Sequence, residues 1–175
     1  MKIHDIEIVD DYLSESDHKL LSNTLITRDS PIDFDWHYNP HKVCDGDDGD
    51  QFNHLFYMIG TKSKHFSLIT PLLGRFNLIA IHRIKANLEL NKNKIYRSPF
   101  HYDWQDPMTG EPTEKMSVGI YYVNTNNGYT EFEGGTVIES VANRMIVFPG
   151  NLKHRGVSQT DTKVRCVINF NLFAP

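Results

Sequence analysis

The pattern of hydrophobic and polar positions changes once along the chain, near residue 76. Before that point, apolar residues recur at helical spacing between polar loops. A short strand is expected over Ile3–Val9, followed by a helix that either Ser14 or Ser16 can cap. The apolar stripe that would hold this helix against the rest of the protein contains Leu13, Leu20, Leu21 and Leu25.

The rest of this N-terminal part holds one extended stretch, one loop and one more helical segment. Phe34–Tyr38 is expected to be extended, and residues 39–51 form an acidic loop that contains glycine. The apolar segment His65–Leu73 is expected to be helical. The pattern of the first 75 residues therefore predicts a largely helical segment that packs against the rest of the fold.

From residue 76 the pattern becomes that of short strands separated by turn residues. Many short strands at this spacing are typical of a sandwich or a barrel. We therefore predict a mainly β fold with N-terminal helices (α+β), in which the helices pack on one sheet. The expected strands are Phe76–Leu88, Ser98–Trp104, Met116–Val123, Gly134–Glu139, Arg144–Phe148, His154–Ser158 and Lys163–Phe173.

The first and last of these strands place polar residues on a face that the fold should bury. Side chains alternate along a strand, so Arg83, Lys85 and Asn87 share one face of the first strand. The last strand has an unbroken apolar face, and its other face carries Arg165 among uncharged residues. A charged side chain inside a barrel is costly unless an anion meets it.

Composition and charge narrow the classes of function. The 175 residues suit one domain over residues 1–175, with 39% hydrophobic residues and a net charge of −4. That charge argues against a nucleic-acid partner. No apolar run is long enough to span a membrane, and the N-terminus lacks the core of a signal peptide. Two cysteines, without metal-type spacing, fit a cytoplasmic location.

The stretch FHYDW at residues 100–104 carries the candidate chemistry. If it is a strand, His101 and Asp103 point to the same face, where they need a hydrogen-bonding partner or a metal ion. His154 and Arg165 follow on what we expect to be neighbouring strands of one hairpin. Two histidines and one carboxylate form the ligand set of non-haem Fe(II) oxygenases. Zn²⁺ also accepts these ligands, although it leaves the arginine without a use.

These motifs together resemble a known family. The segments FHYD, IYYVN, EGGT, VFPGNLKHRGV and VR are similar to those of Fe(II)- and 2-oxoglutarate-dependent oxygenases, in the branch of the prolyl 4-hydroxylases. The resemblance is strong over residues 76–173 and loose before them. It implies a double-stranded β-helix, or jelly roll, over that range.

The resemblance also implies roles for individual residues. His101, Asp103 and His154 match the iron ligands and centre of catalysis, and Arg165 matches the basic residue that binds 2-oxoglutarate. Tyr122 matches a tyrosine that hydrogen-bonds the same cosubstrate. Asn87 stands nearest to the position of another family tyrosine, so the sequence departs from the branch there and proline specificity becomes doubtful.

The activity that the resemblance implies is hydroxylation of a C–H bond, with Fe(II), 2-oxoglutarate and dioxygen, and with release of succinate and carbon dioxide. A peptidyl proline or another protein side chain is the first choice of substrate, and a small molecule the second. The alternative from another class is a cupin-like module that binds a metal or ligand without turnover.

Two expectations concern the remainder of the chain. In related hydroxylases the segment before the jelly roll tends to form a lid, so residues 1–75 are assigned to helical support and lid, with Trp36–Asn53 as the lid itself. The histidines outside the motif lack ligand spacing and are expected on the surface or in loops: His4, His18, His37, His41, His54, His65 and His82.

Overall fold

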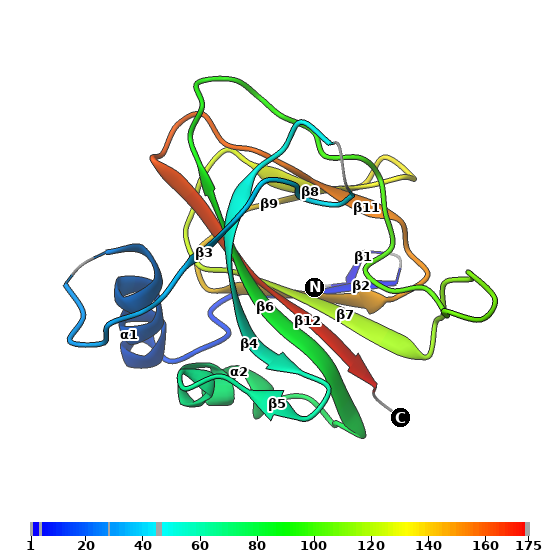
Figure 1. The fold of residues 1–175 in the computed structure, drawn as a ribbon, viewed down its shortest axis with the longest axis horizontal. Helices are drawn as coiled ribbons and strands as arrows, with labels where there is room; N and C mark the ends of the chain where they lie inside the picture. Colours follow the sequence, from blue (N-terminus) through cyan, green and yellow to red (C-terminus); the bar gives the residue numbers. More distant parts are fainter. Residues whose placement is uncertain (1, 4, 28, 45–46, 174–175) are drawn as a thin grey trace.

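The computed structural model describes residues 2–3, 5–27, 29–44 and 47–173, and its main feature is a pair of antiparallel sheets (Figure 1). His4 and residues 45–46 of the predicted acidic loop lie outside the described residues. The large sheet runs in the order β1 (Lys2–Ile3), β2 (Ile6–Val9), β10 (Arg144–Pro149), β7 (Met116–Tyr122), β12 (Val164–Phe173), β6 (Ala80–Leu90), β4 (Gln51–Met58) and β3 (His37–Asn39), with β5 (Thr61–Lys62) paired to β4. The small sheet runs β11 (His154–Val157), β8 (Tyr129–Phe132) and β9 (Val137–Glu139).

The helices cover the outer face of the large sheet, as predicted (Figure 1). Helix α1 (Glu15–Ile26) begins after Ser14, whose side chain accepts a hydrogen bond from the backbone N–H of Asp17. A 3₁₀ turn, η1 (Phe66–Ile69), continues into the short helix α2 (Thr70–Leu73). Leu21 and Leu25 of α1 are buried against the sheet. The prediction for Leu20 was wrong, because its side chain is 48% exposed.

Two apolar layers hold the molecule together, one on each side of the large sheet. The outer layer joins the helices to β12 through residues such as Ile168, Phe170 and Leu172. The inner layer lies between the two sheets, with Ile120, Phe148 and their neighbours. Because β12 lies between the layers, both of its faces are buried, as its sequence predicted. The mainly β fold with helices on one sheet is confirmed.

Several predicted strands differ in extent from those observed. In place of one strand over Ile3–Val9 the structure has two, β1 and β2, which pair in antiparallel orientation. Ser98–Trp104 is not a strand: it contains one isolated bridge, between His101 and His154, and a second bridge joins the preceding Arg97 to Val157. Pro99 lies inside that stretch, and proline has no N–H to donate to a sheet ladder.

Strands β4, β5 and β8 were not predicted from the sequence, and β3 overlaps only the end of the predicted extended stretch Phe34–Tyr38. In β4 the alternation is obscured because Gln51 and His54, both polar, are buried. Strand β8 forms a hairpin with β9 around Gly135, which has a φ of 86°. The expected strand Gly134–Glu139 therefore corresponds to that turn plus β9.

Candidate metal and cosubstrate site

His101, Asp103 and His154 meet at one end of the space between the two sheets. Their ligand atoms all lie within 4.8 Å of one another. Asp103 Oδ1 is 3.6 Å from His101 Nε2 and 3.9 Å from His154 Nε2. The sequence prediction that these three side chains lie together is therefore confirmed in the structure.

Backbone pairing brings the two histidines together. His154 is the first residue of β11, and it exchanges two hydrogen bonds with His101, of 2.9 and 3.0 Å. The expectation that His154 and Arg165 lie on one hairpin was wrong. Strand β11 pairs with β8 in the small sheet, whereas Arg165 lies on β12 in the large sheet. The site therefore spans both sheets.

The hydrogen bonds of the histidines leave the same nitrogen free in both rings. His101 Nδ1 is 3.1 Å from the carbonyl oxygen of Pro99, and His154 Nδ1 is 3.2 Å from that of Leu152. An Nδ1–H that donates to a carbonyl places the lone pair on Nε2. Both Nε2 atoms face Asp103, so the tautomers suit a metal ion.

Asp103 is buried, with its side chain 4% exposed. Burial acts to raise the pKa of this carboxyl, but the nearby His101, His154 and Arg83 outweigh burial, and the net pKa falls below the ordinary value. Burial lowers the pKa of His154. A deprotonated carboxylate and a neutral imidazole are the forms that bind a metal, so the donor set fits a divalent ion.

Asn171 on β12 fixes the orientation of Asp103. Its Nδ2 donates to Asp103 Oδ2 at 2.9 Å, and its Oδ1 accepts from Arg83 Nε at 2.9 Å. Arg83 Nη2 also lies 4.0 Å from Asp103 Oδ1. No sequence motif connects these residues, and the pairing of β12 with β6 could have predicted only the contact of Asn171 with Arg83.

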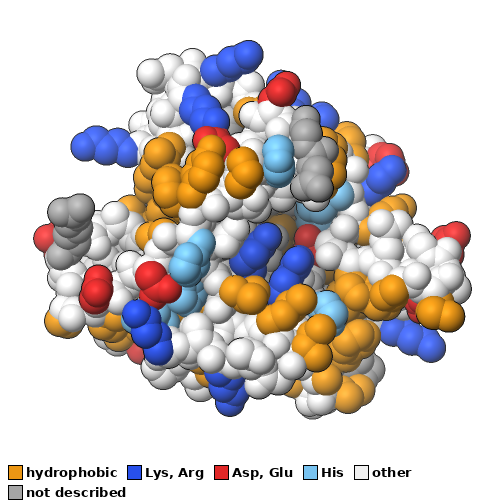
Figure 2. All heavy atoms as spheres, viewed as in Figure 1, with side chains coloured by type: hydrophobic (Ala, Val, Ile, Leu, Met, Phe, Trp, Pro, Cys, Tyr) orange, Lys and Arg blue, Asp and Glu red, His pale blue; other side chains and the backbone are white. Residues whose placement is uncertain are grey.

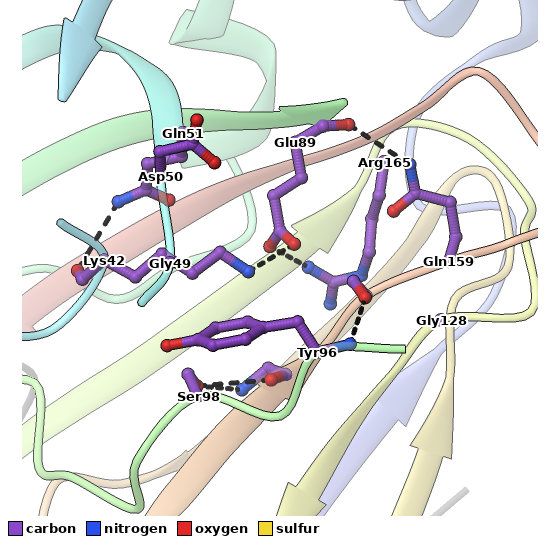
Figure 3. A network of polar contacts seen from close by, with 12 residues as sticks. Lys42, Gly49, Asp50, Gln51, Glu89, Tyr96, Ser98, Gly128, Gln159 and Arg165 are labelled. Atoms are coloured by element: carbon purple, nitrogen blue, oxygen red, sulfur yellow. Dashed lines mark hydrogen bonds and ion pairs between the residues drawn. The ribbon is translucent and has the colours of Figure 1, made fainter. Parts of the chain in front are cut away.

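Arg165 is buried deeper between the sheets, with 3% of its surface exposed. Its Nη1 lies 3.3 Å from Glu89 Oε1, and its Nε donates to Ser140 Oγ at 3.3 Å. Lys42, from the segment before β4, pairs with the same carboxylate (Figure 3). The sequence predicted that an anion meets Arg165. The structure supplies that anion from the protein itself, as Glu89.

Tyr122 and Thr130 lie beside Arg165. The Tyr122 hydroxyl donates to Thr130 Oγ1 at 2.7 Å, and the Arg165 guanidinium lies 5.9 Å from the centre of the Tyr122 ring. Thr130 lines the cavity, while Tyr122 is fully buried behind it. Sequence reasoning missed Thr130, because β8 was not predicted. Gly128 leaves room for this arrangement, since a Cβ there would lie 2.9 Å from Arg165 Cδ.

A cavity of about 330 Å³ joins the histidine cluster to Arg165. Figure 2 looks onto this hollow, where Lys and Arg side chains gather at the centre of the face. One wall is a ladder of inward-facing cross-strand pairs between β6 and β12. From the metal end to the Arg165 end these pairs are Arg83–Asn171, Lys85–Asn169, Asn87–Val167 and Glu89–Arg165.

Asn87 therefore lines the cavity, as its position in the sequence led us to expect. Its Oδ1 is buried and has no hydrogen-bond partner among the described residues. Asn169 Oδ1, on the next inward-facing row toward the metal end, is also buried without a hydrogen-bond partner among the described residues. This wall is built for a polar occupant.

A second group of histidines lies outside the cavity. His54 is buried on β4, so the expectation that it lies on the surface or in a loop was wrong. His65 is also buried, although it lies in the turn before η1 as a loop residue. Ligand atoms of Asp35, His37 and His54 lie within 4.8 Å of one another. However, the backbone oxygen of Asp35 and Ser63 Oγ already engage both ring nitrogens of His54. The group is a hydrogen-bonded network that ties Asp35 to β4.

The sequence matches no protein-family model and no curated protein. Solved structures resemble it over nearly its full length. A viral collagen prolyl hydroxylase from Paramecium bursaria Chlorella virus-1, in complex with 2-oxoglutarate, is 15% identical, with 98% of this chain and 97% of that chain covered and a TM-score of 0.58. A prolyl 4-hydroxylase from Pseudomonas putida is 11% identical, with 98% and 94% covered and a TM-score of 0.59.

A third structure, an oxidoreductase of the 2-oxoglutarate–Fe(II) oxygenase family from Burkholderia pseudomallei, is 14% identical. The match covers 97% of this chain and 85% of that chain, with a TM-score of 0.61. The chain thus has the double-stranded β-helix fold of the 2-oxoglutarate–Fe(II) oxygenases, including the prolyl 4-hydroxylases. None of the described helices is long and apolar enough to cross a membrane.

Proposed function

We propose that this chain is an Fe(II)- and 2-oxoglutarate-dependent dioxygenase that hydroxylates a C–H bond and releases succinate and carbon dioxide. One observation carries the proposal. The Nε2 atoms of His101 and His154 and a carboxylate oxygen of Asp103 converge at the open end of a polar cavity in the fold of these oxygenases. This donor set is typical of non-haem Fe(II) oxygenases.

The three ligands would hold Fe(II), which when bound supplies the activation of dioxygen for the reaction. The residues of the chain supply orientation. The carbonyl oxygens of Pro99 and Leu152 hold both imidazoles in the Nδ1–H tautomer, and Asn171 holds the carboxylate.

Arg165 would bind the distal carboxylate of 2-oxoglutarate. Lys42 and Arg165 share the single negative charge of Glu89, so this buried group keeps one positive charge in excess. A carboxylate that enters beside Thr130 would neutralise that excess, with Tyr122 supporting Thr130 from behind. Asn87 lines the same cavity between the two ends and is assigned to cosubstrate contact.

The substrate is a protein or peptide side chain, a peptidyl proline in the first instance, or a small molecule. The peptide proposal rests on the likeness to prolyl hydroxylases, and the absence of the branch's usual tyrosine at Asn87 weighs against proline itself.

We also propose that residues 1–175 form a single domain and that the protein is located in the cytoplasm. The two free cysteines, Cys44 and Cys166, are compatible with that compartment.

A second candidate function has a specific observation in its favour. Glu89 already pairs with Arg165, which would suit a cupin-like module that holds a metal without turning over 2-oxoglutarate. The test is succinate formation from 2-oxoglutarate with Fe(II) and air, with and without lysate of the source cell. Iron-dependent succinate supports the dioxygenase. Stoichiometric metal binding without any succinate supports the module.

A further inference from the structure

Lys85 is a basic side chain that no step of the proposed reaction uses. It lies on β6 and lines the cavity, one inward-facing row from Arg83 and two rows from Glu89. Within the described part of the chain, the Lys85 ammonium has no side chain within hydrogen-bond or ion-pair distance, and the carboxylate whose charge acts on it is the more distant Asp103. A half-buried ammonium without a partner is costly, so its position calls for an anion.

The charges around the cavity show that 2-oxoglutarate does not meet this requirement. The described lining contains four basic and two acidic side chains: Lys42, Arg83, Lys85, Arg165, Glu89 and Asp103. The walls therefore carry two positive charges in excess. A divalent metal ion and the 2-oxoglutarate dianion cancel each other, so the same excess remains when both are bound.

The excess is located at the metal end of the cavity. At the other end, Glu89 forms ion pairs with both Lys42 and Arg165, and the distal carboxylate of the cosubstrate would neutralise the remaining positive charge. Near the metal, Arg83 is 4.0 Å from Asp103, whose charge a bound metal would share. The charge of Asp103 also acts on Lys85, so Arg83 and Lys85 are the two cations that a bound metal would leave without an anion of their own.

We propose that the substrate of this site carries a carboxylate, which Arg83 and Lys85 bind beside the metal ligands. This inference rests on the proposed function and names its substrate class. A carboxylate is favoured over a nucleic-acid phosphate, because the two cations lie inside the cavity and the chain as a whole carries a net charge of −4. The amide of Asn169, opposite Lys85, has an unpartnered Oδ1, which can accept a hydrogen bond from a donor group of the same substrate but not from its carboxylate.

Direct binding tests the inference with matched probes. The protein is loaded with Mn(II) and 2-oxoglutarate, and binding of N-acetylglutamate and of its neutral counterpart N-acetylglutamine is measured by calorimetry. The tripeptide acetyl-Ala-Glu-Ala-amide and its Gln counterpart distinguish a peptide from a free acid, and inorganic phosphate is the third arm.

We expect the acidic member of at least one pair to bind about tenfold or more tightly than the neutral member, since charge-assisted contacts differ from neutral ones by about that factor. In Lys85→Met this preference should disappear, and Lys85→Arg should restore most of it. The exposed Lys163→Met is the matched control and should keep the preference.

Three results would overturn the inference. These are equal or undetectable binding of both members of each pair, tighter Lys85-dependent binding of phosphate than of either carboxylate, and a loss in Lys85→Met that falls mainly on 2-oxoglutarate. The last result would make Lys85 a cosubstrate residue. If the protein releases succinate but does not distinguish the probes, the proposed function stands and this inference fails. If it prefers the acidic probes but releases no succinate, the carboxylate site stands and the proposed function fails.

Discussion

Asp103 illustrates what single residues contribute to this site. Its carboxylate is buried and deprotonated. Oδ1 lies near two imidazole nitrogens and Arg83, and Oδ2 accepts a hydrogen bond from Asn171. The spacing of His101 and Asp103, together with the resemblance, identified the ligand set. The support from Asn171 could not be predicted, because Asn171 lies 68 residues from Asp103 in the chain and meets it only through their side chains.

Replacing Asn171 with alanine should weaken metal binding without removing a ligand. Loss of the 2.9 Å hydrogen bond to Asp103 frees the carboxylate to rotate, and such supporting contacts are worth about 10–100-fold in metal affinity. Equilibrium titration with Fe(II) under anaerobic conditions measures the change. The exposed Asn151→Ala is the control, and equal affinities in the two variants would show that Asn171 does not support the site.

Arg165 gives a second prediction at this scale. Arg165→Ala should raise the apparent KM for 2-oxoglutarate by about tenfold or more, because a charge-assisted contact in a buried site is lost. Arg165→Lys should retain part of the affinity, since lysine cannot reproduce the planar fork. Succinate formation against cosubstrate concentration is the measurement. Wild-type behaviour in Arg165→Ala would remove this residue from the cosubstrate site.

Among the elements, the segment between β3 and β4 bears most directly on function. The sequence predicted a lid at Trp36–Asn53, and the lid stays a prediction. In the structure both ends of this segment pair into the edge of the large sheet, and Lys42 and Val43 form part of the cavity wall. The pairing was missed because polar residues interrupt the alternation of β4.

Asp47 orders this segment, and its titration predicts a pH dependence. Burial acts to raise its pKa, but hydrogen bonds from the backbone N–H groups of Val43, Lys42, Cys44 and Gly49 prevail and lower the pKa from 3.8 to about 2. A lowered pKa stabilises the loop above pH 3.8, and that stabilisation is lost as the pH falls through about 2.

Hydrogen exchange checks this prediction. In Asp47→Asn the amides of Val43, Cys44 and Gly49 should exchange faster at neutral pH than in the wild type, whereas the exposed Asp48→Asn should leave them protected. Unchanged protection in Asp47→Asn would show that these hydrogen bonds do not order the loop.

For the whole molecule, the two faces of β12 separate stability from function. Its outward face, with Phe170 fully buried, holds the helices on the large sheet, while its inward face lines the cavity. The alternation of apolar and polar residues in the sequence predicted this division. The assignment of each strand to its sheet did not follow from the sequence, since β11 and β12 are neighbours in the chain but lie in different sheets.

Phe170→Ala should therefore destabilise the protein by about 3–5 kcal/mol, through the cavity that it leaves in the outer layer. Val137→Ala is the control, because Val137 is 47% exposed and its truncation should cost within about 0.5 kcal/mol. Urea unfolding measures both values. A small effect of Phe170→Ala would mean that the outer layer contributes little to stability.

The central claim is that His101, Asp103 and His154 bind one Fe(II) ion next to a 2-oxoglutarate site. The most direct measurement is the anaerobic affinity for 2-oxoglutarate with and without Fe(II), in the wild type and in His154→Ala. We predict one iron per chain in the wild type and tight cosubstrate binding only when iron is present, with both lost in His154→Ala. Cosubstrate affinity that is independent of iron, or unchanged iron stoichiometry in His154→Ala, would contradict the account.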